Sequence, residues 1–416
     1  MACCQFPYQV HSVWKTFYGC GKKKSSLCQR VCENLFPLRY HRRYYRSSVT
    51  LFKKDFSKVF RGPNQVFSSG ISTSVETAQT LGQTVPIDSA IHKDESASIS
   101  ASNGRVMLID GTSIIYRAYY KLIARLHHGH LSHADGNGDW VLTIFSALSL
   151  IFDVLELIPS HVAVVFDHDG MNFRHTLYPA YKNNRPPTPD TIVQGLQYLK
   201  ASIKSMSIKV IEVPGVEADD VIGTLAVRSI DAGFKVRVVS PDKDFFQILS
   251  PSLRLLRIAP RGFEMSSFGM EDFARKYGSL KPSQFVDVIS LVGDKSDNIP
   301  GVQGIGNVHA VQLITKFGSL ENLLYCVEQV DEERIKKALI SNAEQAILSK
   351  NLAMLRSDLP IYMVPFTTKD LSFIQPEDNG EKFTSLLKAI GAYAEGFSAD
   401  SIIRRALYLW KKLGSQ

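Results

Sequence analysis

The stretch VPGVEADDVIGTLA, residues 213–226, joins a short apolar strand to a helix and carries three acids at the junction: Glu217, Asp219 and Asp220. The helix is expected over Val221–Ile230, where apolar residues recur at helical spacing. The helix dipole favours acids in a first turn, so the simplest alternative is that these acids only begin the helix. A strand that leads through acids into a helix is otherwise typical of α/β sheets, whose sites lie beyond the carboxyl ends of the strands.

Five short apolar runs, rich in β-branched residues, recur along residues 105–258 with helical segments between them. Strands that are apolar on both faces are typical of a parallel sheet that helices cover on both sides. The sequence therefore predicts an α/β fold with three layers. The expected strands are Val106–Ile109, Val162–Phe166, Val210–Val213, Val236–Val239 and Leu253–Ile258.

Acids also follow the other predicted strands and the next helical segment: Asp110, Asp167, Asp169, Asp242, Asp244, Asp294 and Asp297. Asp110 also suits a turn or a helix N-cap, which are common uses of Asp. Asp242 and Asp244 suit the cap of the helix that follows them, and Asp169 is expected to be a loop residue rather than a ligand. Because acids follow four successive strands, we favour one shared site at the edge of the sheet.

Carboxylates gathered at one edge repel each other, and burying them raises their pKa values and destabilises the fold. Divalent cations remove this repulsion. Oxygen ligands without Cys or His indicate Mg²⁺, with Mn²⁺ as the alternative, rather than zinc. Two such ions about 4 Å apart activate water and stabilise an in-line phosphoryl displacement, which is nuclease chemistry.

The segment FRHTLYPAYKNNRPPTP, residues 173–189, mixes cations with tyrosines and follows the second acid-bearing strand. Cations beside stacking rings are typical of single-stranded nucleic-acid contacts, which predicts that Arg174, Tyr181, Lys182 and Arg185 bind DNA. Arg117, just after the first strand, is expected to add a phosphate contact. The alternative is a solvated charged loop.

Residues 283–325 predict a helical module with a glycine-rich turn between two helices, Ser283–Val292 and Asn307–Phe317. The turn GVQGIG contains Gly301, Gly304 and Gly306. Such a turn exposes backbone amides at a helix N-terminus, which bind phosphate without reading base sequence. Tight packing between the two helices is the alternative reason for the glycines.

The positive charge of the chain is concentrated at its N-terminus. Residues 1–62 hold 13 Lys and Arg against two acids, so they contribute +11 to a net charge of +8 and leave about −3 for the rest. A basic, hydroxyl-rich and acid-poor segment predicts a mitochondrial or chloroplast transit peptide with a disordered linker over residues 1–103. A nucleic-acid-binding arm is the alternative. Five of the six cysteines also lie in this segment, which leaves the body one thiol, Cys326, and suits a reducing compartment.

In six blocks, the sequence resembles the 5′ nuclease domain of bacterial DNA polymerase I and the wider flap endonuclease family. The resemblance runs from Arg105 to Pro360, and its blocks are VMLIDGTSIIYRAYY, VVFDHDGMNFRHTLYPAYKNNRPPTP, VPGVEADDVIGTLA, VVSPDKDFFQIL, VGDKSDNIPGVQGIG and FGSLENLL. It implies a PIN-like, resolvase-like nuclease core followed by a helix-hairpin-helix module. No polymerase segment follows, so a stand-alone nuclease is expected.

The resemblance also implies roles for individual residues. Asp110, Asp167, Glu217, Asp219 and Asp220 would surround a first metal ion, and Asp242, Asp244, Asp294 and Asp297 would complete a second site. Lys182 and Arg185 would lie in a helical arch that admits a 5′ single strand, with Lys182 near the scissile phosphate. Gly301–Gly306 would bind the downstream duplex, and the family often holds K⁺ there.

Three positions depart from the family pattern. Gln303 stands where Lys is usual, and Val308-His309-Ala310 stands where Lys-Thr-Ala is usual, so the duplex contact of the hairpin is expected to be weaker. Ile144-Phe145-Ser146-Ala147 replaces a Tyr-Gly-Phe segment, after a looser loop at His127–Gly138, which puts a branch-point wedge in doubt.

These observations predict a monomeric, metal-dependent 5′-3′ exonuclease or 5′-flap endonuclease in which Lys182, Arg185 and Arg117 are catalytic. Its expected partners are branched or 5′-flap DNA and, as a second substrate, RNA–DNA hybrid, in organellar replication and repair. The predicted domains are residues 1–103, 104–282, 283–360 and a C-terminal tail, 361–416. No run of eighteen apolar residues occurs, so no membrane contact is expected. The alternatives are a non-catalytic DNA-junction binder and a phosphatase for small esters.

Overall fold

The computed structural model describes residues 104–128, 138–258 and 265–414, and the predicted transit peptide lies outside them. One six-stranded sheet has the order β3-β2-β1-β4-β5-β6. Its strands are β1 (Arg105–Asp110), β2 (His161–Phe166), β3 (Lys209–Glu212), β4 (Lys235–Val239), β5 (Leu253–Ile258) and β6 (Met265–Phe268). The five predicted strands are all present and parallel, whereas the antiparallel edge strand β6 was not predicted.

Successive residues of each strand face opposite sides of the sheet, and both sides are buried. In β1, Val106 and Leu108 belong to one hydrophobic core, while Met107 and Ile109 belong to the other. All four side chains have no exposed surface. This two-sided burial explains the continuous apolar runs that predicted the parallel strands.

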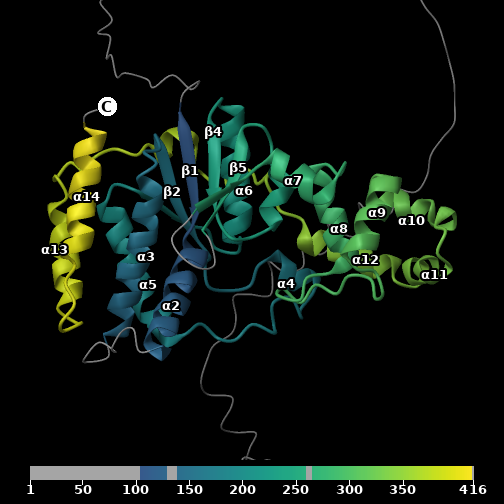
Figure 1. Ribbon diagram of the computed structural model, residues 1–416, viewed down its shortest axis with the longest axis horizontal. Helices are drawn as coiled ribbons and strands as arrows, with labels where there is room; N and C mark the ends of the chain where they lie inside the picture. The colour runs from purple at the N-terminus through teal and green to yellow at the C-terminus, as the bar shows by residue number, and fades with distance from the viewer. Residues whose placement is uncertain (1–103, 129–137, 259–264, 415–416) are drawn as a thin grey trace, which may run out of the picture. The chain divides into compact units, whose positions relative to one another are not determined.

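Helices cover both faces of the sheet and confirm the predicted fold class (Figure 1). On the Met107 side lie α2 (Gly111–His127), α3 (Asp139–Leu155) and α5 (Asp190–Ser205). On the other side lies α6 (Ala218–Asp231), the helix that the opening stretch predicted. A short helix, α4 (Phe173–Leu177), and the 3₁₀ helix η3 (Asp244–Ile248) follow β2 and β4.

A helical module follows the sheet. Its elements are α7 (Met270–Tyr277), η4 (Pro282–Gln284), α8 (Phe285–Val292), α9 (Asn307–Phe317), α10 (Leu320–Tyr325), η5 (Val327–Gln329), α11 (Glu333–Ser341) and α12 (Ala343–Ala353). Helix α8 packs against α9 and α12, and α9 has the predicted bounds. Gly301, at φ 64°, lies so close to Gly293 that a Cβ would be 2.3 Å from the Gly293 nitrogen, so only glycine fits.

The segment predicted as a tail is part of the folded body. After η6 (Thr368–Leu371), the helices α13 (Glu381–Gly391) and α14 (Asp400–Leu413) pack against α5 and α3 respectively (Figure 1). Phe383 and Trp410 are buried in the same core as Met107. Arg405 of α14 also donates to Asp153 and Glu156, each at 2.7 Å. The C-terminal tail predicted over residues 361–416, whose role the sequence left open, thus supplies apolar residues that complete the outer face of the helical layer.

Within the ranges that the structure describes, no helix combines the length and the apolar character needed to cross a membrane.

Replacing Trp410 with Ala is expected to lower the free energy of unfolding by about 3–5 kcal/mol, the usual cost of a large aromatic-to-alanine cavity. The Trp410 ring is 1% exposed and packs edge-to-face on Phe383 at 5.6 Å. Urea unfolding followed by circular dichroism measures the change. Tyr408→Ala on the same helix, where the side chain is 67% exposed, is the control and should change stability by less than about 0.5 kcal/mol.

Candidate active site

Asp110 and Asp167 stand at the carboxyl ends of the neighbouring strands β1 and β2, which pair in parallel. Asp110 caps α2: its Oδ1 accepts from the Ser113 N–H at 2.9 Å, and its Oδ2 accepts from Ser240 Oγ at 2.9 Å. The capping role that the sequence offered as an alternative is thus real. Asp167 Oδ1 accepts from the Ala218 N–H at 2.9 Å and so ties β2 to the start of α6.

These carboxyl groups are close enough to repel one another. Burial and then the charge of Asp167 raise the pKa of Asp110 to about 6, although bonds from Ser113 and Ser240 oppose the shift. Burial raises the pKa of Asp219 well above its usual range, and Asp110, Asp242 and Asp167 raise it further. The structure therefore brings together four of the predicted metal ligands, one from each of four chain segments.

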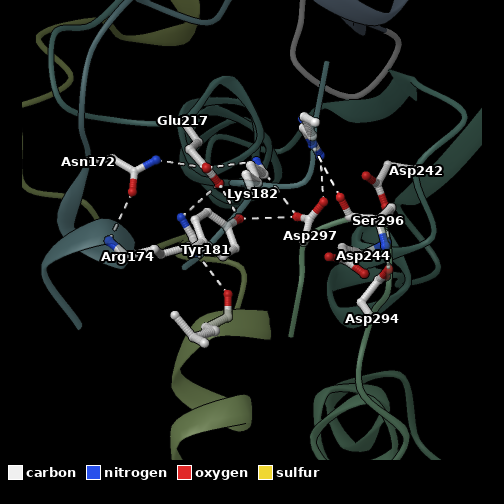
Figure 2. A network of polar contacts seen from close by, with 12 residues as sticks. Asn172, Arg174, Tyr181, Lys182, Glu217, Asp242, Asp244, Asp294, Ser296 and Asp297 are labelled. Carbon is white, nitrogen blue, oxygen red and sulfur yellow. Dashed lines mark hydrogen bonds and ion pairs between the residues drawn. The ribbon is translucent and has the colours of Figure 1, made fainter. Parts of the chain in front are cut away.

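A second group of acids consists of Asp242, Asp244, Asp294 and Asp297 (Figure 2). It adjoins the first group at Asp242, whose charge acts on Asp219. Burial raises the pKa of Asp244 well above its usual range, and the charge of Asp242 adds to the effect. Asp244 Oδ1 is buried and has no hydrogen-bond partner within the described chain. In contrast, bonds from Ser296 and the ammonium of Lys243, 2.9 Å away, outweigh burial and lower the pKa of Asp294.

Arg174 is the centre of a buried ion-pair network that the sequence did not predict (Figure 2). Its Nη1 donates to Glu217 at 3.0 Å and to Asp220 at 2.6 Å, and its Nη2 donates to Asp220 at 2.9 Å. Its remaining bonds go to the carbonyls of Leu352 and Met354 at the end of α12. All five guanidinium N–H groups are therefore used inside the protein, and the side chain is 4% exposed. Arg174 does not reach solvent as a DNA contact, contrary to the prediction.

Tyr181 is buried as well and differs from its predicted role as a stacking surface for DNA. Its hydroxyl oxygen lies 3.1 Å from an Asp297 oxygen and 3.2 Å from a Glu217 oxygen, so the two carboxylates share its single donated proton. Burial and these two carboxylates raise its pKa, so it stays protonated and bridges them. Asn172, which the sequence reasoning missed, donates to the other Glu217 oxygen at 2.8 Å and caps α4. The only sequence signal was its cap position before the short helix.

Lys182 and Arg185 project from turns that pack against residues 294–298, rather than from a helical arch. The Lys182 N–H donates to the Asp297 carbonyl at 3.0 Å, and its φ of 54° is uncommon for a residue other than glycine. Its ammonium lies 2.7 Å from Glu217 and 3.7 Å from Asp297. Burial lowers the pKa of Lys182, but the two carboxylates outweigh it and raise the pKa. Arg185 is about half exposed and pairs with Asp297.

Arg117 is predicted to contact phosphate. It lines a cavity of about 50 Å³ together with Ser113 and Ser240, the two residues that donate to Asp110.

Among the hairpin glycines, which are predicted to offer backbone amides to phosphate, Gly301 does not fit that role. Its N–H donates to Ser349 Oγ at 3.1 Å, and its carbonyl accepts from Gln345 at 2.7 Å, so packing on α12 uses both groups. Gly304 and Gly306 are exposed, as a duplex contact requires.

The described residues contain no group of three or more His, Cys, Asp or Glu side chains whose present arrangement could hold a metal ion. The acids nevertheless fit a divalent cation in charge and ligand type. Burial raises the pKa values of Asp110, Asp219, Asp242 and Asp244, and the charges of neighbouring carboxylates raise them further. Hard carboxylate oxygens are the donors that Mg²⁺ prefers.

Two family models match consecutive parts of the chain. The N-terminal resolvase-like domain of 5′-3′ exonucleases matches residues 105–278, and their C-terminal SAM fold matches residues 280–379. The chain belongs to the 5′-3′ exonuclease family. Members of this family are hydrolases, so the predicted family, fold and enzyme class are confirmed.

Two bacterial DNA polymerases are among the relatives of this chain. DNA polymerase I of Bacillus caldotenax is 36% identical over 288 residues, which are 69% of this chain and 31% of that protein. The thermostable DNA polymerase I of Thermus caldophilus is 38% identical over 259 residues, or 62% of this chain and 29% of that protein. The chain thus spans about a third of the length of these relatives.

Among solved structures, a T5 5′-exonuclease with bound divalent zinc ions is 21% identical to this chain at a TM-score of 0.50. The match covers 70% of this chain and all of that one, and it supports the fold.

In metal-free protein, Asp110→Asn is expected to stabilise the fold at neutral pH but not at acid pH. The folded pKa of Asp110, about 6, exceeds the usual 3.8, so wild-type stability is lost as pH rises from about 4 to above 6. The loss approaches about 3 kcal/mol, while Asn at this position keeps the cap and does not titrate. Urea unfolding in chelator at pH 4 and pH 7.5 measures the difference. A variant whose advantage is equal at both pH values would contradict the assignment.

Proposed function

We propose that this protein is a metal-dependent, structure-specific 5′ nuclease that hydrolyses DNA phosphodiesters as a 5′-3′ exonuclease and 5′-flap endonuclease. The observation that carries the proposal is the acidic edge of the sheet, where Asp110, Asp219, Asp242 and Asp244 have raised pKa values. Uncompensated carboxylates at the carboxyl ends of parallel strands, in a member of this family, favour cation-assisted phosphoryl chemistry.

We propose that divalent cations bind to Asp110, Asp167, Asp219, Asp242 and Asp244. Mg²⁺ is the expected ion, and Mn²⁺ is the alternative. When bound, such cations would lower the pKa of a coordinated water and stabilise the charge that develops on phosphate oxygens. Glu217 and Asp297 have a different part in this proposal, because they hold the Lys182 ammonium at 2.7 and 3.7 Å. Their charge keeps Lys182 protonated and orients it.

Lys182 and Arg185 are proposed to bind the scissile phosphate. The ammonium of Lys182 is kept cationic by its neighbours, and half of the Arg185 side chain is open to solvent. Positioned cations of this kind stabilise the transition state more than the ground state, because they are fixed before charge develops. Arg117, beside the donors to Asp110, is proposed as a third phosphate contact.

The proposed substrate is a single-strand/duplex junction, with an RNA–DNA hybrid as a second substrate and the monomer as the active form. The exposed Gly304 and Gly306 favour a sequence-independent contact with duplex phosphates. K⁺ at the hairpin is also part of the proposal, and comparing K⁺ with Na⁺ in the binding assay tests it. Removal of RNA primers and 5′ flaps in organellar DNA replication and repair is the role that such an activity fits.

Asp219→Ala and Lys182→Ala are each expected to slow cleavage of a 5′-flap duplex in Mg²⁺ by about a hundredfold or more. Lys388→Ala removes an exposed cation of α13 and should leave the rate unchanged. The assay measures single-turnover rates on labelled flap, nicked and blunt DNA, with binding measured in Ca²⁺. Binding without cleavage by the wild type would favour the junction binder instead. Hydrolysis of small esters that ignores Lys182→Ala would favour a phosphatase.

We propose that residues 1–103 direct the protein to mitochondria or chloroplasts. The +11 charge of residues 1–62, in a chain whose remainder is about −3, supports this. A fusion of residues 1–103 to a fluorescent protein should enter one of these organelles in plant cells. Replacing the six cations at 39–54 by Gln should leave it in the cytosol. Nuclear accumulation of the unaltered fusion would support a nucleic-acid-binding arm instead.

A further inference from the structure

The hairpin of this protein lacks cations of its own. Residues 301–308, GVQGIGNV, contain no charged side chain, although Gln303 and Val308 are exposed. His309 follows, and its Nε2 lies 3.7 Å from the Glu332 carboxylate. Phosphate contacts need positive charge or amides, and most of the affinity for a duplex comes from the charged ones. Any such charge at this surface must come from another element.

Arg334 of α11 lies beside the apex of the hairpin. A Cβ placed on Gly304 would meet Arg334 Nη1 at 3.4 Å. The Arg334 side chain is 65% exposed, and it forms a pair with Glu332 at 3.5 Å. An exposed pair of this length contributes little and leaves the guanidinium able to turn to a phosphate. The guanidinium fork suits phosphate oxygens in geometry as well as in charge.

Lys276 of α7 approaches the hairpin from a second element. A groove of about 580 Å³ is lined by Lys276 and Tyr277 of α7, by α8, and by Asn307 and Val308 at the start of α9. The Lys276 ammonium lies 5.2 Å from the centre of the Tyr277 ring. Lys243 also lines this groove, but it is held by Asp294 at 2.9 Å. Lys276 is thus an exposed cation across the groove from the first turn after the hairpin.

We propose that Arg334 and Lys276 contact the phosphates of the duplex arm next to the hairpin and supply the charge that Gln303 and Val308 do not. The occupant is the backbone of double-stranded DNA, because Arg334 lies beside the exposed Gly304 and Lys276 lines the groove that Asn307 and Val308 border, within a body of about −3 net charge. Contacts of this type do not read base sequence. The inference rests on the proposed function, since it assigns the duplex contact of that nuclease.

The test measures binding of the full chain to a fluorescein-labelled 5′-flap duplex by anisotropy in Ca²⁺, across a salt titration. Arg334→Gln and Lys276→Gln are each expected to weaken binding about five- to tenfold at 0.1 M salt. Each should also make the negative slope of log K against log salt shallower by about 0.9, because one phosphate contact is lost. The double variant should make this slope shallower by about 1.8. Lys388→Gln, on α13, is the matched control and should bind as the wild type does.

Two further readouts separate a phosphate contact from a structural effect. The losses should be equal on two duplexes of unrelated sequence and absent on a single strand of the same length. Gln303→Lys, which returns a cation to the hairpin, should restore the slope in the Arg334→Gln background. If the wild type binds and cuts the flap, and both single variants keep the wild-type affinity and salt slope, this inference is wrong but the proposed function stands. A wild type that neither binds nor cuts it would overturn the proposed function together with the inference.

Discussion

Carboxylates that share one edge of the sheet repel each other, and the rest of the site is organised around that repulsion. Asp110 ends β1 and receives bonds from Ser113 and Ser240, yet burial and Asp167 still raise its pKa to about 6. Serine hydroxyls and backbone amides stabilise such charges only in part. The fold therefore keeps a concentrated negative charge at the edge, which is the property that a divalent cation or a lysine would balance.

Internal cations balance the part of this charge that lies toward the helical module. Arg174 pairs with Asp220 and Glu217, and its other donors hold the end of α12. Removing one partner from a buried pair leaves an uncompensated charge, so such networks fix relative positions strongly. The same residues therefore connect the segment that carries Lys182 to the sheet and to α12. Rigid support of this kind is what a loop needs if it is to position a phosphate.

The molecule also distributes one task over distant segments of the chain. The apolar faces of α13 and α14 complete a core that begins with β1, nearly three hundred residues earlier. At the hairpin, the nearby cations come from α7 and α11, because the turn itself is uncharged. In the first case distant helices supply the apolar cover of a core, and in the second they supply positive charge beside an uncharged turn. Only folding brings these segments together.

The sequence by itself determined the five parallel strands, the acids at their ends and the bounds of α9, because apolar runs, helical periodicity and glycine stops are local properties. Only the tertiary structure decided which acids keep an uncompensated charge. Asp219 and Asp220 are neighbours in the same first turn, but about 100° of helix rotation separates them. Asp219 consequently faces the other carboxylates, whereas Asp220 meets Arg174. The sequence did not reveal the burial of Arg174 and Tyr181 or the packing of the C-terminal helices for the same reason, since their partners lie far away in sequence and no local pattern records them.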